Sequence, residues 1–167
     1  MRFALASSLA LLVTTTAACG WLSSEPPLFT VGELVPRIDE LNGKRLRVAG
    51  YLGDCAVYSC DLYPSKEDVA VWNRAFAELR TTRHFNDPKL PVLGIGTGKA
   101  EERGFEFDRK AAPFHQRYVV ITGTVDNRCR YKGERGCTDR SPDLNPTDIS
   151  LWTGPVPPRP ASPGRKA

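Results

Sequence analysis

The chain has 167 residues and carries 23 lysines and arginines against 19 aspartates and glutamates, a formal net charge of +4. Apolar residues make up 41% and charged residues 25%, which is ordinary for a globular protein and excludes disorder throughout. Arg2, Arg159, Arg165 and Lys166 lie near the two ends, in stretches without acids, and they account for the whole net charge. The body between them is neutral, which argues against a nucleic-acid-binding protein.

Residues 1–18 have the organisation of a secretory signal peptide. Arg2 precedes an apolar run that ends at Val13 and is too short to span a bilayer as a stable helix. The segment closes as Thr16-Ala17-Ala18-Cys19-Gly20. Small residues before a cysteine resemble the lipobox of bacterial lipoproteins. This resemblance implies cleavage before Cys19, acyl chains such as palmitate on Cys19, and a membrane anchor on the periplasmic face. An ordinary signal peptide cut near Ala18 is the alternative.

The remaining chain divides into three parts. Residues 19–27 are expected to form a short polar tether and residues 28–153 one folded body. Residues 154–167 are rich in proline and are expected to be extended or disordered. A body of this size buries roughly two-thirds of the surface of its extended chain, which is enough for one core.

The first half of the body combines helical and strand patterns. Leu34, Ile38 and Leu41 have helical spacing. Residues 44–53 alternate apolar and polar side chains, as a half-buried strand does, and residues 56–63 are a second strand candidate.

A helix is expected to begin after Ser65. The Ser65-Lys66-Glu67-Asp68 segment resembles a capping box, in which the serine oxygen accepts a backbone N–H three residues later. One face of this helix is apolar. Its residues are Val69, Trp72, Phe76 and Leu79.

The second half of the body contains three further strand candidates. Residues 90–95 form the first, and Asp108 is expected to cap a short helix that ends before Pro113. Tyr118–Val125 has the most regular strand pattern, and residues 148–152 form the last strand.

Two strands share a glycine at their centre. Gly50 within residues 48–52 lines up with Gly123 within residues 121–125, and a central glycine lets a strand bend enough to serve two sides of a small barrel. Five short strands with a helix before the fourth follow the order of the OB-fold.

Residues 43–52, 62–68 and 118–125 are also similar to those of small bacterial lipoproteins with OB-like domains. The resemblance implies a mainly β protein with short helices, an OB-fold-like five-stranded small barrel. The helix around Trp72 would be an insertion between the second and third strands. A generic small β-barrel or α+β domain is the alternative.

The cysteines point to disulfides. If Cys19 carries lipid, the other four form an even set suited to an oxidising compartment. Their C-x4-C and C-x7-C spacings fit a structural zinc site poorly, and no C-x-x-C redox motif is present. Three connectivities are possible. In an OB barrel the first and fourth strands run antiparallel, which favours local pairing of Cys55 with Cys60 and of Cys129 with Cys137.

The loop of residues 128–140 carries five basic residues and two acidic ones. In OB-folds the corresponding loop lines the binding face. A binder of an anionic glycan or another acidic envelope ligand would use this loop, with tyrosines stacking on the ligand. A solvated charged loop and core-packing tyrosines are the alternative interpretation. The candidate binding residues are Tyr51, Tyr58, Arg128, Arg130 and Arg135.

Motifs for enzymatic chemistry are missing from the sequence. The glycine-rich residues 94–100 lack the first glycine and the final hydroxyl residue of a phosphate-binding loop, so no nucleotide cofactor is expected. His84 and His115 are the only histidines, and no G-x-S-x-G or H-E-x-x-H motif accompanies them. A hydrolase centred on His84 or His115 therefore stays an alternative without a motif.

The sequence thus predicts a non-enzymatic, lipid-anchored cell-envelope protein that binds or scaffolds through an OB-like domain. Its expected partners are the membrane, reached through the lipid anchor, and an envelope glycan or protein. No metal or cofactor is expected.

Overall fold

The computed structural model describes residues 25–56, 59–96, 100–101, 104–133, 136–140 and 143–155. Within these ranges, only the backbone is described for residues 56, 59, 100–101, 104, 129–133 and 136–140. The main sheet has six strands: β1 (Leu28–Thr30), β2 (Arg45–Ala56), β3 (Ser59–Tyr63), β4 (Leu93–Gly96), β7 (Tyr118–Val125) and β10 (Leu144–Leu151). Two small sheets are formed by β5 (Ala100–Glu101) with β6 (Gly104–Phe105) and by β8 (Cys129–Gly133) with β9 (Gly136–Arg140). The helical elements are α1 (Val31–Leu34), η1 (Val35–Arg37), α2 (Lys66–Thr82), α3 (Glu106–Ala111) and η2 (Ala112–Phe114).

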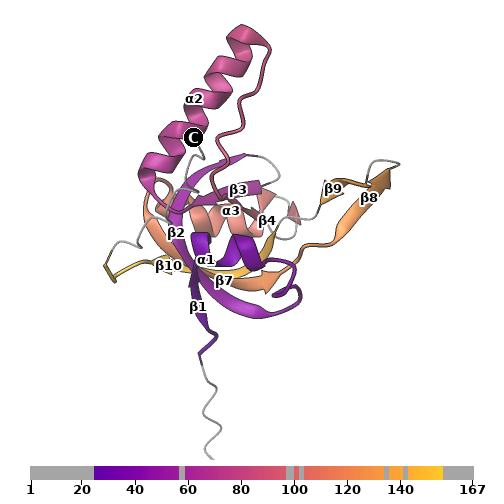
Figure 1. The fold of residues 1–167 in the computed structure, drawn as a ribbon. Helices are drawn as coiled ribbons and strands as arrows, with labels where there is room; N and C mark the ends of the chain where they lie inside the picture. Colours follow the sequence, from indigo (N-terminus) through magenta and orange to yellow (C-terminus); the bar gives the residue numbers. More distant parts are fainter. Residues whose placement is uncertain are drawn as a thin grey trace, which may run out of the picture.

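The strand pairings of the main sheet return to their starting point. β2 pairs with β3 and β3 with β4, both antiparallel, and β4 pairs in parallel with β10. β10 then pairs antiparallel with β7, and β7 pairs antiparallel with β2 (Figure 1). β1 lies outside this ring, parallel to β2, with Leu28 opposite Arg47. In the described part of the chain, no helix is both long and apolar enough to cross a membrane.

The expected strands are present, with shifted bounds. Tyr118–Val125 is confirmed as β7, and its residues alternate between half-buried and buried as the sequence pattern requires. β2 extends three residues beyond the expected strand, to Ala56, and β10 begins at Leu144, where Pro146 and Asp148 flank a shift in register. β10 therefore starts four residues before the strand that the sequence pattern predicts at residue 148.

The two short helical segments differ from expectation. The spacing of Leu34, Ile38 and Leu41 predicts a continuous helix, but α1 begins at Val31 behind a capping box between Thr30 and Glu33 and passes into η1 by residue 35. A proline in the first turn of η1 favours this tight helix. The prediction that Asp108 caps α3 is wrong, because the N-cap is Phe105.

The helix α2 begins as predicted, but most of it does not pack on the core. The Ser65 hydroxyl accepts a hydrogen bond from the Asp68 N–H. α2 ends at Thr82, and its C-cap Arg83 has a left-handed backbone with φ 60°. Of its seventeen residues, only Asp68 and Ala75 are buried. No residue of the apolar face belongs to the core cluster of the described residues, and α2 projects from the sheet (Figure 1).

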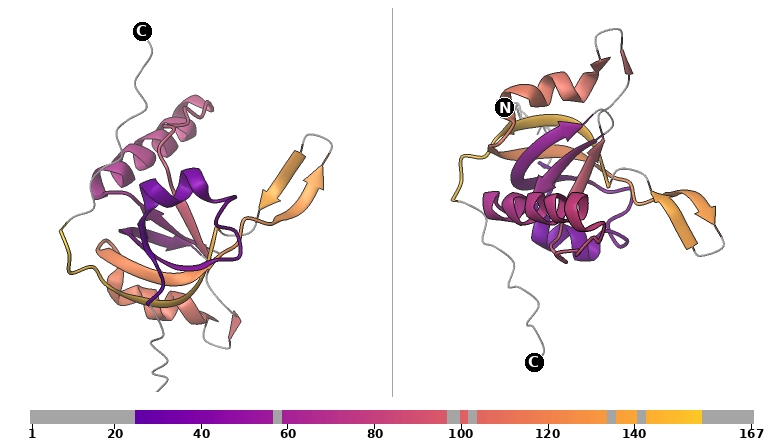
Figure 2. Two further views of the ribbon diagram at one scale, coloured as in Figure 1. Left: turned by 60° about the horizontal axis from the view of Figure 1, so that its bottom comes forward. Right: turned by 90° about the horizontal axis from the view of Figure 1, so that it is seen from above.

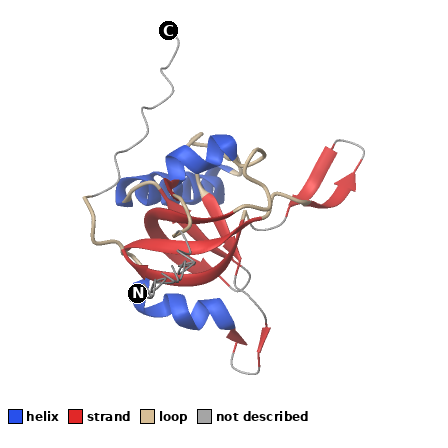
Figure 3. Cartoon of the chain, turned by 90° about the horizontal axis from the view of Figure 1, so that it is seen from below, coloured by secondary structure: helices blue, strands red, loops and turns tan. Residues whose placement is uncertain are grey.

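The core fills the interior of the ring. Its fully buried side chains come from α1 and from every strand of the ring, and Phe107 and Ala111 of α3 close it on one side (Figure 3). Both central glycines lie where another chain segment passes close by. A Cβ on Gly50 would lie 2.8 Å from the Tyr63 carbonyl oxygen, and one on Gly123 would lie 2.5 Å from the Asn145 carbonyl oxygen. At both positions the ring requires the absence of a side chain.

Candidate functional site

A disulfide closes the connection between β2 and β3. Cys55 and Cys60 lie opposite each other in the two strands, and their sulfurs are bonded, which confirms the predicted local pairing. Cys60 is fully buried, and its Sγ lies 3.6 Å from Oδ1 of Asp108 on α3. The two sulfurs and this carboxylate are near enough to share a metal ion. The disulfide occupies both thiolates, however, so the group is structural as it stands.

The second cysteine pair lies in the β8–β9 hairpin. The side chains of Cys129 and Cys137 fall outside the described set, so their pairing stays a prediction. The backbone register places Cys137 opposite Lys132 and Cys129 opposite Arg140.

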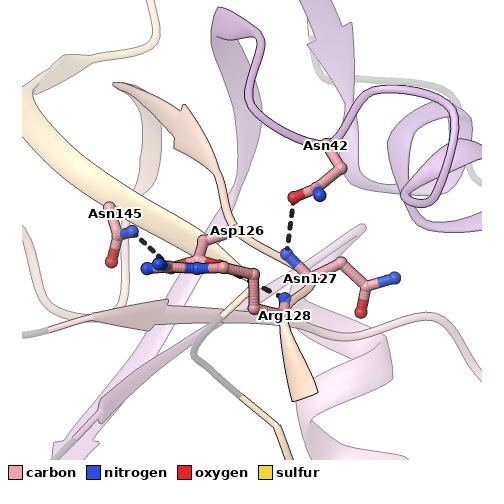
Figure 4. A network of polar contacts seen from close by, with 5 residues as sticks. All are labelled: Asn42, Asp126, Asn127, Arg128 and Asn145. Atoms are coloured by element: carbon pink, nitrogen blue, oxygen red, sulfur yellow. Dashed lines mark hydrogen bonds and ion pairs between the residues drawn. The ribbon is translucent and has the colours of Figure 1, made fainter. Parts of the chain in front are cut away.

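A buried carboxylate holds the root of the β8–β9 hairpin. Asp126 follows β7 directly and is only 6% exposed. Its oxygens accept hydrogen bonds from Nε and Nη2 of Arg128 at 2.8 and 2.7 Å. They also accept one from Nδ2 of Asn145 at 3.0 Å (Figure 4). The hydrogen bonds from Arg128 hold the pKa of Asp126 well below its usual range, because they favour the charged carboxylate.

Further contacts link this root to the loop before β2. The Asn127 N–H donates to Oδ1 of Asn42 at 3.0 Å, and its side-chain amide donates to Asp39. The Gly43 N–H donates to the carbonyl of Val125 at 2.9 Å. The segment that leaves the ring is therefore held from two sides, and the β8–β9 hairpin extends away from the body (Figure 2).

Arg128 has a structural task besides any role in binding. Its side chain is 75% exposed, yet its guanidinium is paired with Asp126. The side chains of Arg130 and Arg135 and the whole of Tyr58 lie outside the described set, so their proposed roles stay predictions.

Tyr51 lies beside an open cavity between β2 and α2. The residue is 6% exposed, and its ring meets the Tyr118 ring edge-on, with the centroids 5.2 Å apart. Burial is the main cause of its raised pKa. Little of the ring is free to stack on a ligand. The cavity measures about 210 Å³ and is lined by Tyr51, Gly53, Asp54, Lys66, Val69, Ala70, Asn73 and Gln116.

The structure does not bring the two described binding candidates together. Tyr51 pairs with Tyr118 at the start of β7, whereas Arg128 follows the end of that strand. An eight-residue strand spans about 26 Å. The cavity at Tyr51 and the β8–β9 hairpin are therefore separate places on the fold, and the binding roles of Tyr51 and Arg128 stay predictions.

The two histidines also lie apart in the fold. His84 is exposed in the segment that follows α2, and its N–H donates to the Thr82 hydroxyl. His115 follows η2, and its Nε2 is buried without a hydrogen-bond partner among the described residues. A further hollow of about 210 Å³ lies between α3 and β10, beside the Glu106–Lys110 ion pair. Neither histidine lines either cavity.

Sequence reasoning missed the polar residues of the cavity at Tyr51. Asp54, Lys66, Asn73 and Gln116 come from three separate segments and form no motif along the chain. Comparison with protein-family models, with curated proteins and with solved structures finds no match to this chain.

Proposed function

We propose that this protein is a non-enzymatic, lipid-anchored component of the bacterial cell envelope whose OB-like domain binds an acidic envelope glycan through the β8–β9 hairpin. The observation that carries the proposal is the hairpin itself. It extends from the body, and its root is held by the buried Asp126. A hairpin held at its root presents its side chains at less entropic cost than a free loop does.

The strand order supports an OB-like domain. The ring runs β2–β3–β4–β10–β7, so the first strand of the ring neighbours the second and the fourth. α3 precedes β7, the fourth ring strand, and α2 is inserted between the second and third. In OB-folds the loop between the last two strands borders the binding face, and here that loop is the β8–β9 hairpin.

The disulfide supports a location outside the cytoplasm. Cys55–Cys60 is the kind of bond that persists in the periplasm and at cell surfaces and is rare in the reducing cytosol. Together with the lipobox-like residues that end at Cys19, it favours export followed by lipid attachment.

The charge of the hairpin supports an acidic ligand. Arg128 forms an ion pair with Asp126, and residues 129–140 carry four further basic residues and two acidic ones. Exposed charges of this kind steer association and depend on ionic strength more than they add affinity. An anionic polysaccharide offers many such charges to one projecting hairpin.

The anchor is tested by changing Cys19 to alanine. Metabolic labelling with a fatty-acid analogue should mark the wild-type protein and leave the Cys19→Ala variant unlabelled and released from membranes, because the acyl chains have no other attachment point. Label that persists in the variant would contradict the anchor. A Cys55→Ala, Cys60→Ala variant is the matched control, since it removes cysteines but keeps Cys19.

The hairpin is tested by reversing its charge. Arg130→Glu with Arg135→Glu should abolish most retention on dextran sulfate and most co-sedimentation with purified cell-wall sacculi, and the wild-type binding should weaken as salt is added. Arg74→Glu with Arg80→Glu makes the same charge change on α2 and should leave binding nearly intact. Equal losses in both variants would show that net charge, and not the hairpin, determines binding.

A further inference from the structure

Three aromatic rings gather on the projecting part of the chain. We call α2 together with residues 83–92 the aromatic arm. The Trp72 and Phe76 ring centroids lie 5.7 Å apart, those of Phe76 and Phe85 5.4 Å, and those of Trp72 and Phe85 6.0 Å. Phe76 is 44% exposed and Phe85 37%. The cluster is therefore packed within itself but open to its surroundings on one side.

The described body does not use this cluster. The ring is already filled by its own side chains, and none of the three rings belongs to the core. Exposed apolar clusters of this kind mark interaction sites. Trp72 also offers an unsatisfied hydrogen-bond donor, because its Nε1 is buried without a hydrogen-bond partner among the described residues. A buried N–H without an acceptor costs free energy, so the arm lacks both apolar cover and one hydrogen-bond acceptor.

The chain itself contains a segment with matching chemistry. Beyond Pro155 the sequence continues for twelve residues, among them Pro157, Pro158, Pro160 and Pro163. Proline-rich segments favour the polyproline II conformation, which makes no internal hydrogen bonds and leaves its carbonyls free. Such segments dock in grooves lined by aromatic rings, where prolines pack on the rings and carbonyls accept hydrogen bonds.

The described chain ends beside the start of the arm. The Trp152 N–H donates to the carbonyl of Tyr118 at 3.0 Å, and the Tyr118 hydroxyl accepts the Lys66 N–H at 3.4 Å. The end of β10 and the first residue of α2 are thus linked through one tyrosine. The views agree that the described residues after β10 lie on the side where α2 begins (Figures 1 and 2).

The segment is long enough to reach the rings. In the polyproline II conformation, residues 156–163 span about 25 Å at about 3.1 Å per residue. Along α2, Trp72 lies about 9 Å and Phe76 about 15 Å beyond Lys66 at about 1.5 Å per residue. No unfolding of β10 or α2 is needed for contact.

We propose that residues 156–163 of the same chain dock on the aromatic arm as a polyproline II segment, with proline rings on Phe76 and Phe85 and a backbone carbonyl as the acceptor for Trp72 Nε1. Docking within one chain avoids the translational entropy that a separate peptide loses on binding. The inference is independent of the lipid anchor and of the β8–β9 hairpin.

The test compares the full isotope-labelled protein with a variant in which Pro157, Pro158, Pro160 and Pro163 are serine. The readout is the NMR resonance of the Trp72 indole N–H, identified through Trp72→Phe. The proline variant should shift this resonance and increase its solvent exchange. The Trp152 indole N–H donates to the Pro155 carbonyl at 2.7 Å, which both proteins keep, so its resonance should not move. An unchanged Trp72 resonance would overturn the proposal.

Two further measurements make the result specific. In a Phe76→Ala, Phe85→Ala background the proline changes should no longer affect Trp72, whereas Arg159→Gln with Arg165→Gln should leave the wild-type resonance in place. In a chain that ends at Pro155, an added peptide of residues 155–167 should restore the resonance in a saturable way. If the signal of the full chain depends on protein concentration, the segment comes from a second copy and the proposal as stated is wrong.

Discussion

Gly123→Ala should destabilise the protein by about 2–3 kcal/mol, the cost of forcing extra atoms into a packed interior. A Cβ at this position would lie 2.5 Å from the Asn145 carbonyl oxygen and 2.9 Å from Cγ of Leu144. The first of these neighbours is backbone of β10, which pairs with β7 on both sides of the contact, with a register shift between Pro146 and Asp148. Because backbone cannot move aside as a side chain can, the two strands must separate locally.

The measurement is urea unfolding followed by circular dichroism at neutral pH. The control is Thr124→Ala on the same strand, where the residue is half-buried and the change removes atoms instead of adding them, and it should cost well under half as much. A Gly123→Ala protein as stable as the control would show that β7 and β10 are not packed as closely as described.

The two glycines show how far the sequence could predict the ring. Their central positions in Tyr118–Val125 and residues 48–52 indicated a local requirement of both strands, and the alternation around them predicted which face is buried. The physical reason differs in part from the expected one. A strand that bends needs backbone freedom, but Gly50 and Gly123 are also required because other backbone segments pass within contact distance.

The helix α2 shows where sequence patterns stop being informative. A spacing of 3.6 residues reports that one face is apolar, but it does not identify what covers that face. Trp72 and Phe76 of this face pack on each other and on Phe85 from the segment that follows α2. Among the described residues, the helical members of the core cluster come from α1 and α3, which is a tertiary property that no window of α2 contains.

The cavity at Tyr51 was missed for the same kind of reason. Asp54, Lys66 and Gln116 converge only because β2 pairs with both β3 and β7. The Cys55–Cys60 bond was predictable, since the two residues lie close in sequence at the connection between consecutive strands. Local pairing can be inferred from sequence, whereas a site assembled from three segments cannot.

Asp126→Asn should lower the free energy of unfolding by about 2 kcal/mol at neutral pH. The carboxylate is buried and accepts charge-assisted hydrogen bonds from Arg128 and a further one from Asn145. The exposure of the Arg128 side chain reduces the value of the pair, because solvent screens it. The asparagine keeps the size of the side chain, so the loss reports charge and hydrogen bonding rather than a cavity.

The same variant predicts a pH dependence with a definite sign. Asp126 has a lowered pKa in the folded protein, mainly because of its hydrogen bonds with Arg128, whereas an aspartate in an unfolded chain has a pKa of about 3.9. The carboxylate therefore adds stability that is fully present above about pH 4 and is lost as the pH falls below it. The difference between wild type and Asp126→Asn should be constant from about pH 7 to pH 5 and should shrink at pH 3. Arg128→Gln removes the principal cause of the shift and should flatten the acid limb in the same way. A difference that stays the same at pH 3 would mean that Asp126 is not held as its charged form, and the root of the β8–β9 hairpin would then lack the contact that fixes its direction.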